Sequence, residues 1–230
     1  DLTRPDDGLV DLSVAGTRLA DARILGVAIP SLKAGRAELP TEAYVRGIDL
    51  VAVYEESEAW PVRLDALWRA TRSEEPGGSI AAVDLVLSVW TSFLESRPEL
   101  TVCSTMPVGQ LLRLSGAGPA EHETLTVPPG LPLAVGPAEG PGCLLFRLAH
   151  ADLSYAEMVH PADFRHAALG RAGQRGELVR VVHRLFQQPL EKGVVLRARV
   201  RGVWLPRRDD ARLAAQQYEA FAAAEPPLGA

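Results

Sequence analysis

WPVRLDALWRATR, residues 60–72, alternates apolar and polar side chains and decides the fold class. Arg63, Asp65 and Arg69 occupy polar positions, and Leu67 alone breaks the pattern. Successive side chains of a β-strand point to opposite faces, so a period of two predicts a strand with one buried face. The predicted buried face consists of Trp60, Val62, Leu64, Ala66, Trp68 and Ala70.

The flanking sequence repeats this pattern. IAAVDLVLSVWTSFLE, residues 80–95, also alternates, and the polar turn SEEPGGS separates it from the first stretch, which predicts a hairpin of long strands. AYVRGIDLVAVYEES, residues 43–57, is predicted as one further strand. ELVRVVHRLF (177–186) and GVVLRARVRGVWL (193–205) are predicted to form a second long hairpin across the loop QQPLEKG.

Two segments carry helix signals. RDDARLAAQQYEAFAAAEPP, residues 208–227, has Asp209 or Asp210 as a cap and apolar residues at helical spacing. HPADFRHAALG, residues 160–170, has Pro161 in its first turn and Gly170 at its end, which predicts a short helix. No helix recurs between strands, which excludes a βαβ sheet. We therefore expect an all-β fold, a large antiparallel β-sandwich with a short internal helix and a C-terminal helix, forming a single domain over residues 1–230.

Composition and charge limit the function classes. The net charge of −5 argues against a general nucleic-acid binder, which needs a basic excess. No run approaches the roughly 18 apolar residues that span a bilayer, so we expect a soluble protein without membrane contact. Residues 161–212 hold twelve basic and five acidic side chains, a net of +7, and the other residues hold twelve basic and twenty-four acidic ones, a net of −12. This asymmetry marks either an anion-binding face or pairing between the two parts.

The cysteines and the N-terminus bear on disulfide formation and on the cellular compartment. Cys103 and Cys143 lie in apolar, strand-like runs, which favours buried free thiols over a single disulfide bridge. The chain begins at Asp1 rather than Met, so the N-terminus does not fix the compartment, and a cytoplasmic location is slightly favoured.

EMVHPADFRH, residues 157–166, places side chains that bind metals or transfer protons close together. If the segment is helical from Pro161, then His160, Asp163 and His166 share an arc of about 120°. Such a set suits a transition metal, but it lacks the spacing of a known metal motif. We therefore expect no metal and no other cofactor, and favour a structural role, with a catalytic or ligand-binding role as the alternative.

An arginine row and one tryptophan are the candidate ligand-binding residues. Alternation places Arg197, Arg199 and Arg201 on one sheet face, where guanidinium groups can hold carboxylates, sulfates or phosphates or pair with acidic neighbours. Trp90 falls on the polar face of its strand beside Ser88, as in platforms that bind sugar rings. The alternative is that Trp90 packs under a loop or against another subunit.

The long alternating strands, WPVRLDALWRATR, VDLVLSVWTSFLE and VVLRARVRGVWLP, resemble the supersandwich of galactose-mutarotase-like and polysaccharide-lyase-associated domains. Members with epimerase activity use two histidines and a later carboxylate as acid and base at the anomeric carbon of a sugar. The resemblance implies His160 or His166, together with His183 and Glu191, as catalytic residues, although no matching motif is present. A shared fold does not by itself imply a shared activity.

Three functions follow as hypotheses. The first is binding of a sugar or acidic glycan on the face that bears Arg197, Arg199, Arg201 and Trp90. The second is an epimerase- or lyase-like enzyme that uses His160, His166, His183 and Glu191. The third is an interaction module, including a homo-oligomer, that uses Trp90 and the arginine row. The sequence contains no hydrolase, nucleotide-binding or redox motif that would favour another class.

Overall fold

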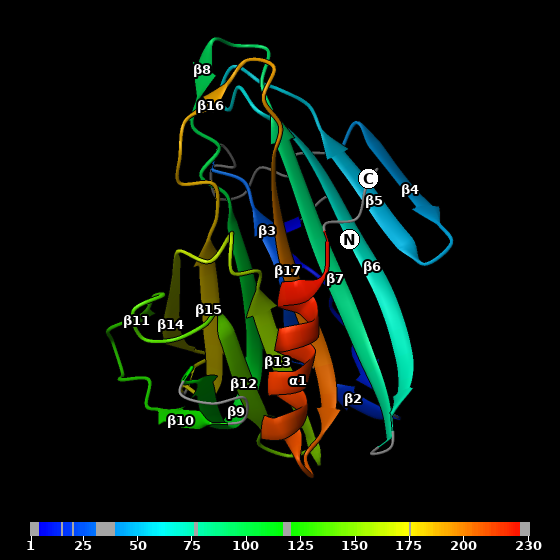
Figure 1. The fold of residues 1–230 in the computed structure, drawn as a ribbon, viewed down its shortest axis with the longest axis vertical. Coiled ribbons are helices and arrows are strands. Elements are labelled where there is room, and N and C mark those ends of the chain that lie inside the picture. The colour runs from blue at the N-terminus through cyan, green and yellow to red at the C-terminus, as the bar shows by residue number, and fades with distance from the viewer. Residues whose placement is uncertain are drawn as a thin grey trace.

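The computed structural model describes residues 5–14, 16–19, 21–30, 40–75, 78–116, 121–174 and 176–225. Antiparallel strands dominate it, and one α-helix lies near the C-terminus (Figure 1). A three-residue 3-10 helix precedes the first strand at Pro5–Asp7. The strands are β1 (Leu12–Val14), β2 (Thr17–Leu19), β3 (Arg23–Ala28), β4 (Glu42–Arg46), β5 (Asp49–Tyr54), β6 (Arg63–Glu75), β7 (Gly78–Trp90), β8 (Glu95–Ser96), β9 (Thr101–Leu114), β10 (His122–Leu125), β11 (Leu133–Val135), β12 (Cys143–Leu148), β13 (Leu153–Val159), β14 (His166–Ala172), β15 (Leu178–Arg184), β16 (Leu190–Glu191) and β17 (Leu196–Pro206).

Strand β9 joins the two layers of the sandwich. Its first half pairs with β3 on one side and β15 on the other, and its second half pairs with β10 and β12. The first layer has the order β11-β14-β15-β9-β3, and the second layer has the order β10-β9-β12-β13-β17-β7-β6-β5-β4. The largest apolar cluster contains residues of both layers, which shows that they close against each other. The predicted large antiparallel β-sandwich is confirmed.

The stretch that predicted the fold occupies the expected position. Leu64, Ala66 and Trp68 are buried in the cluster between the layers. Leu67, which breaks the alternation, is buried on the opposite face, in a small separate cluster with Val51 and Val86. The exception in the sequence pattern therefore marks a second apolar contact, on the outer face of the second layer.

The predicted hairpin of long strands is confirmed, whereas the other two strand predictions need correction. Strands β6 and β7 pair from Arg63 opposite Trp90 to Glu75 opposite Gly78. Residues 43–57 form two strands, β4 and β5, because the chain turns at Gly47, whose φ of 63° suits glycine. Strands β15 and β17 do not form a hairpin: β15 pairs with β14 and β9, and β17 pairs with β13 and β7. The connecting loop crosses from one layer to the other.

The predicted internal helix at 160–170 is wrong. The amides of Asp163 and Phe164 both donate to the carbonyl of His160, which closes a single turn after β13. The chain then enters strand β14 at His166. Forming a first helical turn is unfavourable, because it fixes several backbone dihedral angles in return for few hydrogen bonds. The next residues therefore pair with β11 and β15 instead of extending the helix.

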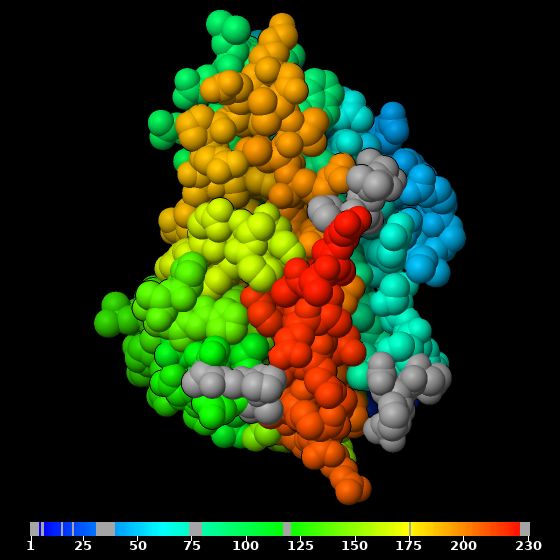
Figure 2. Space-filling view, in the orientation of Figure 1, coloured from blue at the N-terminus to red at the C-terminus, as the bar shows by residue number. Residues whose placement is uncertain are grey.

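The predicted C-terminal helix is confirmed as α1 (Asp210–Ala223). Its buried side chains Leu213, Tyr218 and Phe221 pack on the outer face of the second layer, against residues of β12, β13 and β17. Figure 2 shows α1, in red, lying along the surface beside the green and yellow parts of the chain. Asp209 occupies the N-cap position with φ of 59°, but its side chain makes no capping hydrogen bond.

Two further expectations can be compared with the structure. Cys103 and Cys143 are both buried free thiols, as predicted, and burial raises the pKa of Cys143 to about 12. In the part of the chain that the structure describes, no helix is long and apolar enough to span a membrane.

Candidate functional site

The arginine row has the predicted orientation, but each of its members has a different environment. Arg197 donates from Nε to Ser88 Oγ at 3.2 Å. Arg199 is buried and donates to the carbonyls of Ala224 and Glu225 at 2.8 and 3.2 Å. Arg201 forms a bidentate pair with Asp84, with distances of 2.6 and 2.9 Å. These three side chains therefore do not form one continuous open surface for a glycan.

Trp90 is half-buried, and one face of its ring is covered. The guanidinium carbon of Arg63 lies 5.5 Å from the ring centroid, within the range of a cation–π contact. Nη1 of Arg63 also pairs with Glu55 at 2.6 Å, which keeps the guanidinium in place. A sugar ring would have to displace Arg63 to stack on this face.

The four predicted acid–base residues lie in separate places. His160 occupies the turn after β13, and His166 begins β14 opposite Arg184. His183 is fully buried inside the sandwich, whereas Glu191 is exposed on β16. The two pockets described below are lined by none of these four residues.

His160, Asp163 and His166 are the residues whose spacing raised the possibility of a metal site. Nδ1 of His160 lies 4.0 Å from Asp163 Oδ2, and its Nε2 lies 3.2 Å from the carbonyl of Ala222 in α1. Its ring also meets Phe221 edge-on, at 5.8 Å between centroids. Among the described residues, no group of three or more His, Cys, Asp or Glu side chains could hold a metal ion. His160 thus packs under the helix.

Glu157 is the centre of a buried polar cluster between the layers. Its Oε1 lies 2.9 Å from His183 Nε2, and its Oε2 accepts hydrogen bonds from Tyr155 at 2.8 Å and from Ser104. Ser104 Oγ in turn accepts the amide of Leu25 at 2.9 Å. Burial, and then the Glu157 carboxylate, raise the pKa of Tyr155 well above its ordinary value.

This cluster is closed to solvent. Glu157, His183 and Tyr155 have no exposed surface, and the ring of Tyr155 packs 4.7 Å from that of Trp204. Nδ1 of His183 is buried and has no hydrogen-bond partner among the described residues. The side chains combine acid–base chemistry with an environment that no substrate reaches, so we interpret the cluster as a structural link between the layers.

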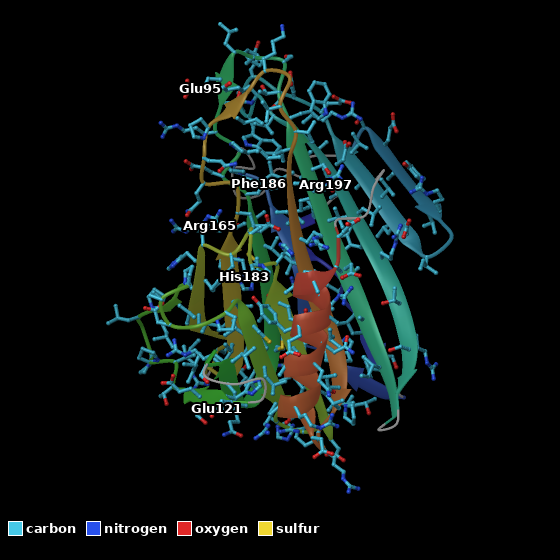
Figure 3. All side chains as sticks on the ribbon, in the orientation of Figure 1. Glu95, Glu121, Arg165, His183, Phe186 and Arg197 are labelled. Carbon is cyan, nitrogen blue, oxygen red and sulfur yellow. The ribbon has the colours of Figure 1, made fainter. Side chains whose placement is uncertain are left out.

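A polar pocket of about 260 Å³ lies where the two layers separate, and its lining combines an aromatic ring with amide and guanidinium groups. Strand β13 ends at Val159, which pairs with Val200, so the first residues of β17 extend beyond it. The turn after β13 and the loop after β15 meet this free stretch of β17. The lining residues are Ala162, Asp163, Arg165, Phe186, Gln187, Gln188, Leu196, Arg197 and Ala198. Figure 3 labels Arg165, Phe186 and Arg197 at this level of the molecule.

Asp163 fixes the turn on one side of the pocket. Its Oδ2 accepts the backbone N–H of Arg199 at 2.9 Å, which joins the turn to β17. Burial raises the pKa of Asp163, while the Arg199 amide, His160 and nearby arginines oppose that rise. The Asp163 carboxylate therefore attaches this turn to β17.

Phe186 and two glutamines form the other side. Phe186 has φ of 54°, which is unusual for a bulky residue and holds the chain away from the direction of β15. It is half-buried and packs against the core, and the exposed Gln187 and Gln188 follow it. An aromatic ring beside amide and guanidinium groups can contact the apolar face of a sugar and hydrogen-bond its hydroxyl groups.

Several of these residues lay outside the candidates from the sequence. Arg197 was a candidate from the sequence, but Phe186, Gln187, Gln188 and Arg165 were not. These residues lie close together because the loop 185–195 crosses from one layer to the other. The predicted hairpin of 177–186 with 193–205 placed both strands side by side in one sheet, so it did not indicate this proximity. Glu157 begins the quoted stretch 157–166 but was not a candidate site residue, and β13, which is almost entirely buried, gives no alternating signal for it.

Comparisons with known proteins inform the fold. No protein-family model and no curated protein matches this sequence. Among solved structures, a putative aldose 1-epimerase from Escherichia coli K12 has a TM-score of 0.52 at 10% identity, over 88% of this chain and 82% of that chain. A GalM/aldose epimerase homologue from C. elegans has a TM-score of 0.50 at 8% identity, over 85% of this chain and 78% of that chain.

A third similar structure is much longer than this chain. The galactosidase domain of an alpha-galactosidase-sucrose kinase, AgaSK, has a TM-score of 0.45 at 14% identity. The match covers 83% of this chain but 28% of that one. The two epimerase-like structures align over most of both chains, and at these identities the likeness concerns the fold alone. The predicted resemblance is confirmed: this chain has a galactose-mutarotase-like β-supersandwich fold.

Proposed function

We propose that this protein binds a carbohydrate, without transforming it, in the pocket between Arg165, Phe186 and Arg197. The observation that carries the proposal is the convergence of one aromatic ring, two amides and two guanidinium groups on a single concavity of about 260 Å³. Sugar sites combine an apolar contact with a few placed polar groups, and this pocket contains both. The names of structures with this fold, which include aldose epimerases, support a sugar as ligand.

The charge of the pocket favours an acidic sugar. Among the residues that the structure describes, Arg165 donates to the carbonyl of Phe164, at 3.1 Å, and forms no ion pair with a carboxylate. Asp163 is bound to the Arg199 amide, so it does not form an ion pair that neutralises Arg165 at hydrogen-bond distance. A guanidinium group can hold a carboxylate or sulfate through two parallel hydrogen bonds. We therefore expect glucuronate to bind more tightly than glucose.

The proposal does not include acid–base catalysis. His183 and Glu157 are buried, and His160, His166 and Glu191 lie in three other places. General acid–base catalysis requires the acid or base to lie within about 3 Å of the group whose proton it transfers, or to reach it through one water.

Titration calorimetry with glucuronate and glucose tests the proposal. Wild-type protein should bind glucuronate in the millimolar range, about −4 kcal/mol. Phe186→Ala and Arg165→Gln should each weaken binding about tenfold, which corresponds to about 1.4 kcal/mol. Arg208→Gln is the control, since it removes the same charge from an exposed residue just before α1.

Two outcomes would overturn the assignment. One is the absence of binding by any sugar at high millimolar concentration. The other is equal affinity of wild type and Phe186→Ala for glucuronate. If a stable homodimer accompanies the absence of sugar binding, the interaction-module hypothesis gains support instead.

A further inference from the structure

Arg199 is a buried cation without a carboxylate partner in the described part of the chain. Its relative exposure is 7%, and its hydrogen bonds go to two backbone carbonyls, those of Ala224 and Glu225. A guanidinium group has five N–H donors, so three remain without a described partner. A buried charge is costly unless it is paired, and the described residues supply no counter-charge at hydrogen-bond distance from the Arg199 guanidinium group.

The neighbouring arginines are already neutralised. Arg201 forms two hydrogen bonds with Asp84, at 2.6 and 2.9 Å. Arg69 forms two with Asp49, at 2.7 and 2.8 Å. Each of these cations has its own carboxylate, and the positive charge in excess is that of Arg199. Burial lowers the pKa of Arg199, and the more distant Asp163 and Asp84 offset part of that effect.

These side chains line a second, smaller pocket on the outer face of the second layer. Its volume is about 120 Å³, and its polar lining consists of Arg69, Asp84, Arg199 and Arg201. The remaining walls are Leu67, Val86 and Phe221, which are apolar. Since a site for one water needs roughly 10–15 Å³, this volume can hold several waters or one compact anion.

Phe221 contacts both Arg199 and Arg201. Its ring centroid lies 5.3 Å from the guanidinium carbon of Arg199 and 4.9 Å from that of Arg201. Both distances fall within the range of cation–π contacts. An apolar wall also lowers the local dielectric constant, which strengthens the interaction of Arg199 with an anion.

We propose that this pocket binds a compact oxyanion, a sulfate, phosphate or carboxylate group, with Arg199 as its main ligand. The anion supplies the missing counter-charge and occupies the free N–H donors, while Arg201 adds positive potential beyond its pair with Asp84. Because Arg199 also binds the carbonyls at the end of α1, anion binding strengthens the attachment of the helix to β17. This site is separate from the sugar pocket and does not depend on it.

Titration calorimetry with sodium sulfate, sodium phosphate and sodium acetate, at ionic strength matched with sodium chloride, tests the proposal. Wild-type protein should bind at least one of these probes, and Arg199→Gln should weaken that binding about tenfold or more. Arg199→Lys keeps the charge but not the planar donors, so an intermediate affinity is expected. Arg208→Gln is the matched control for charge and should bind as wild type does.

Thermal unfolding in sulfate and in chloride gives a second measurement. Sulfate stabilises most proteins by exclusion from their surface, so the informative quantity is the difference between variants. Arg199→Gln should lose the part of the stabilisation that saturates with sulfate, because bound ligand stabilises according to its concentration relative to Kd. Circular dichroism of each variant confirms that α1 and the sheets have formed.

The probes distinguish the sources of the oxyanion. Binding of sulfate or phosphate assigns the pocket to free ions, and binding of acetate alone, lost in Arg199→Gln, assigns it to a carboxylate of a larger ligand. Phe186→Ala should leave this binding unchanged, so failure of the sugar proposal does not remove the anion site. The proposal is overturned if no probe binds to wild type, or if Arg199→Gln binds the probes with wild-type affinity.

Discussion

The cluster around Glu157 and the pocket around Phe186 both contain several polar side chains, but in opposite environments. Glu157 and His183 have no exposed surface and meet between the layers. Gln187 and Gln188 are exposed and lie where the layers separate. The residues with the most reactive chemistry are therefore those that a ligand does not reach.

This contrast shows why the residue type is a poor guide to the site in this fold. Inside the sandwich, a carboxylate with three side-chain partners connects β13 of one layer to β9 and β15 of the other. At the rim, the amide groups of Gln187 and Gln188 and the guanidinium group of Arg165 line a pocket where the strands end. We expect changes inside to alter stability and leave binding intact, and changes at the rim to do the reverse.

The largest effect is expected from Glu157→Ala. The change leaves His183, Tyr155 and Ser104 without their shared partner in a closed interior. Breaking a buried pair by removing one member typically costs about 3–5 kcal/mol. Urea denaturation should show this loss in the free energy of unfolding. Glu191→Ala, an exposed glutamate, is the control and should change stability by less than about 0.5 kcal/mol. A loss under about 1 kcal/mol for Glu157→Ala would contradict the structural role.

Gly202→Ala should disturb the same cluster from β17. A Cβ at position 202 would lie 2.3 Å from the hydroxyl oxygen of Tyr155 and 2.7 Å from its ring. Both distances are too short, so Tyr155 has to move away from Glu157, and overpacking of this kind costs about 1–3 kcal/mol. Gly170→Ala is the matched control, because a Cβ there meets no atom within 4 Å. Thermal unfolding compares the two, and an equal Tm for both would break the argument.

The parts of the fold that local patterns encode were predictable. The alternation at 60–72 and 80–90 gave the β6–β7 hairpin, and helical spacing gave α1. The charge asymmetry also resolves partly into pairs between the two parts of the chain, such as Arg201 with Asp84. These features depend on neighbours in sequence or on a strong period, which a single sequence displays.

The parts that depend on distant contacts were not predictable. The segment 160–170 carries Pro and Gly at helical positions, yet pairing with β11 and β15 makes its second half a strand. Strand β13 is buried on both faces, so the pattern LSYAEMV lacks the alternation that would mark Glu157 as inward-facing. The candidate site combines residues 162–165 with 186–188 and 196–198, and their meeting follows from the exchange of layers after β15.

The attachment of α1 should give stability that depends on pH. Asp210 receives two hydrogen bonds from Arg147, at 2.9 and 2.7 Å, and one from Ser154 at 2.7 Å. Burial raises the pKa of Asp210, but these bonds outweigh it and the net pKa lies below 3.8. Since the folded pKa is depressed, this stability is present above the unfolded pKa and is lost as pH falls through the folded one.

Asp210→Asn therefore should destabilise the protein at pH 7 by about 1–2 kcal/mol, because the ion pair of the buried Asp210 with the partly exposed Arg147 is lost while an acceptor for Ser154 remains. The difference from wild type should shrink below about pH 4, which chemical denaturation at several pH values measures. Asp209→Asn is the control, because its exposed side chain makes no capping hydrogen bond. If the difference in free energy of unfolding between wild type and Asp210→Asn stays constant down to pH 2, Asp210 does not account for the loss of stability in acid.

The smallest effect on stability is expected at the rim, with Gln187→Ala. The side chain is exposed and lines the pocket proposed to bind a sugar, so its loss should change the free energy of unfolding by less than about 0.5 kcal/mol. If its amide binds a sugar hydroxyl, the same change should weaken glucuronate binding by about 1 kcal/mol, or roughly fivefold. Gln216→Ala, an exposed glutamine on α1, should alter neither quantity. Calorimetry and denaturation of the same two variants decide the point: a stability loss without a binding loss at Gln187 would make this rim structural, like the interior.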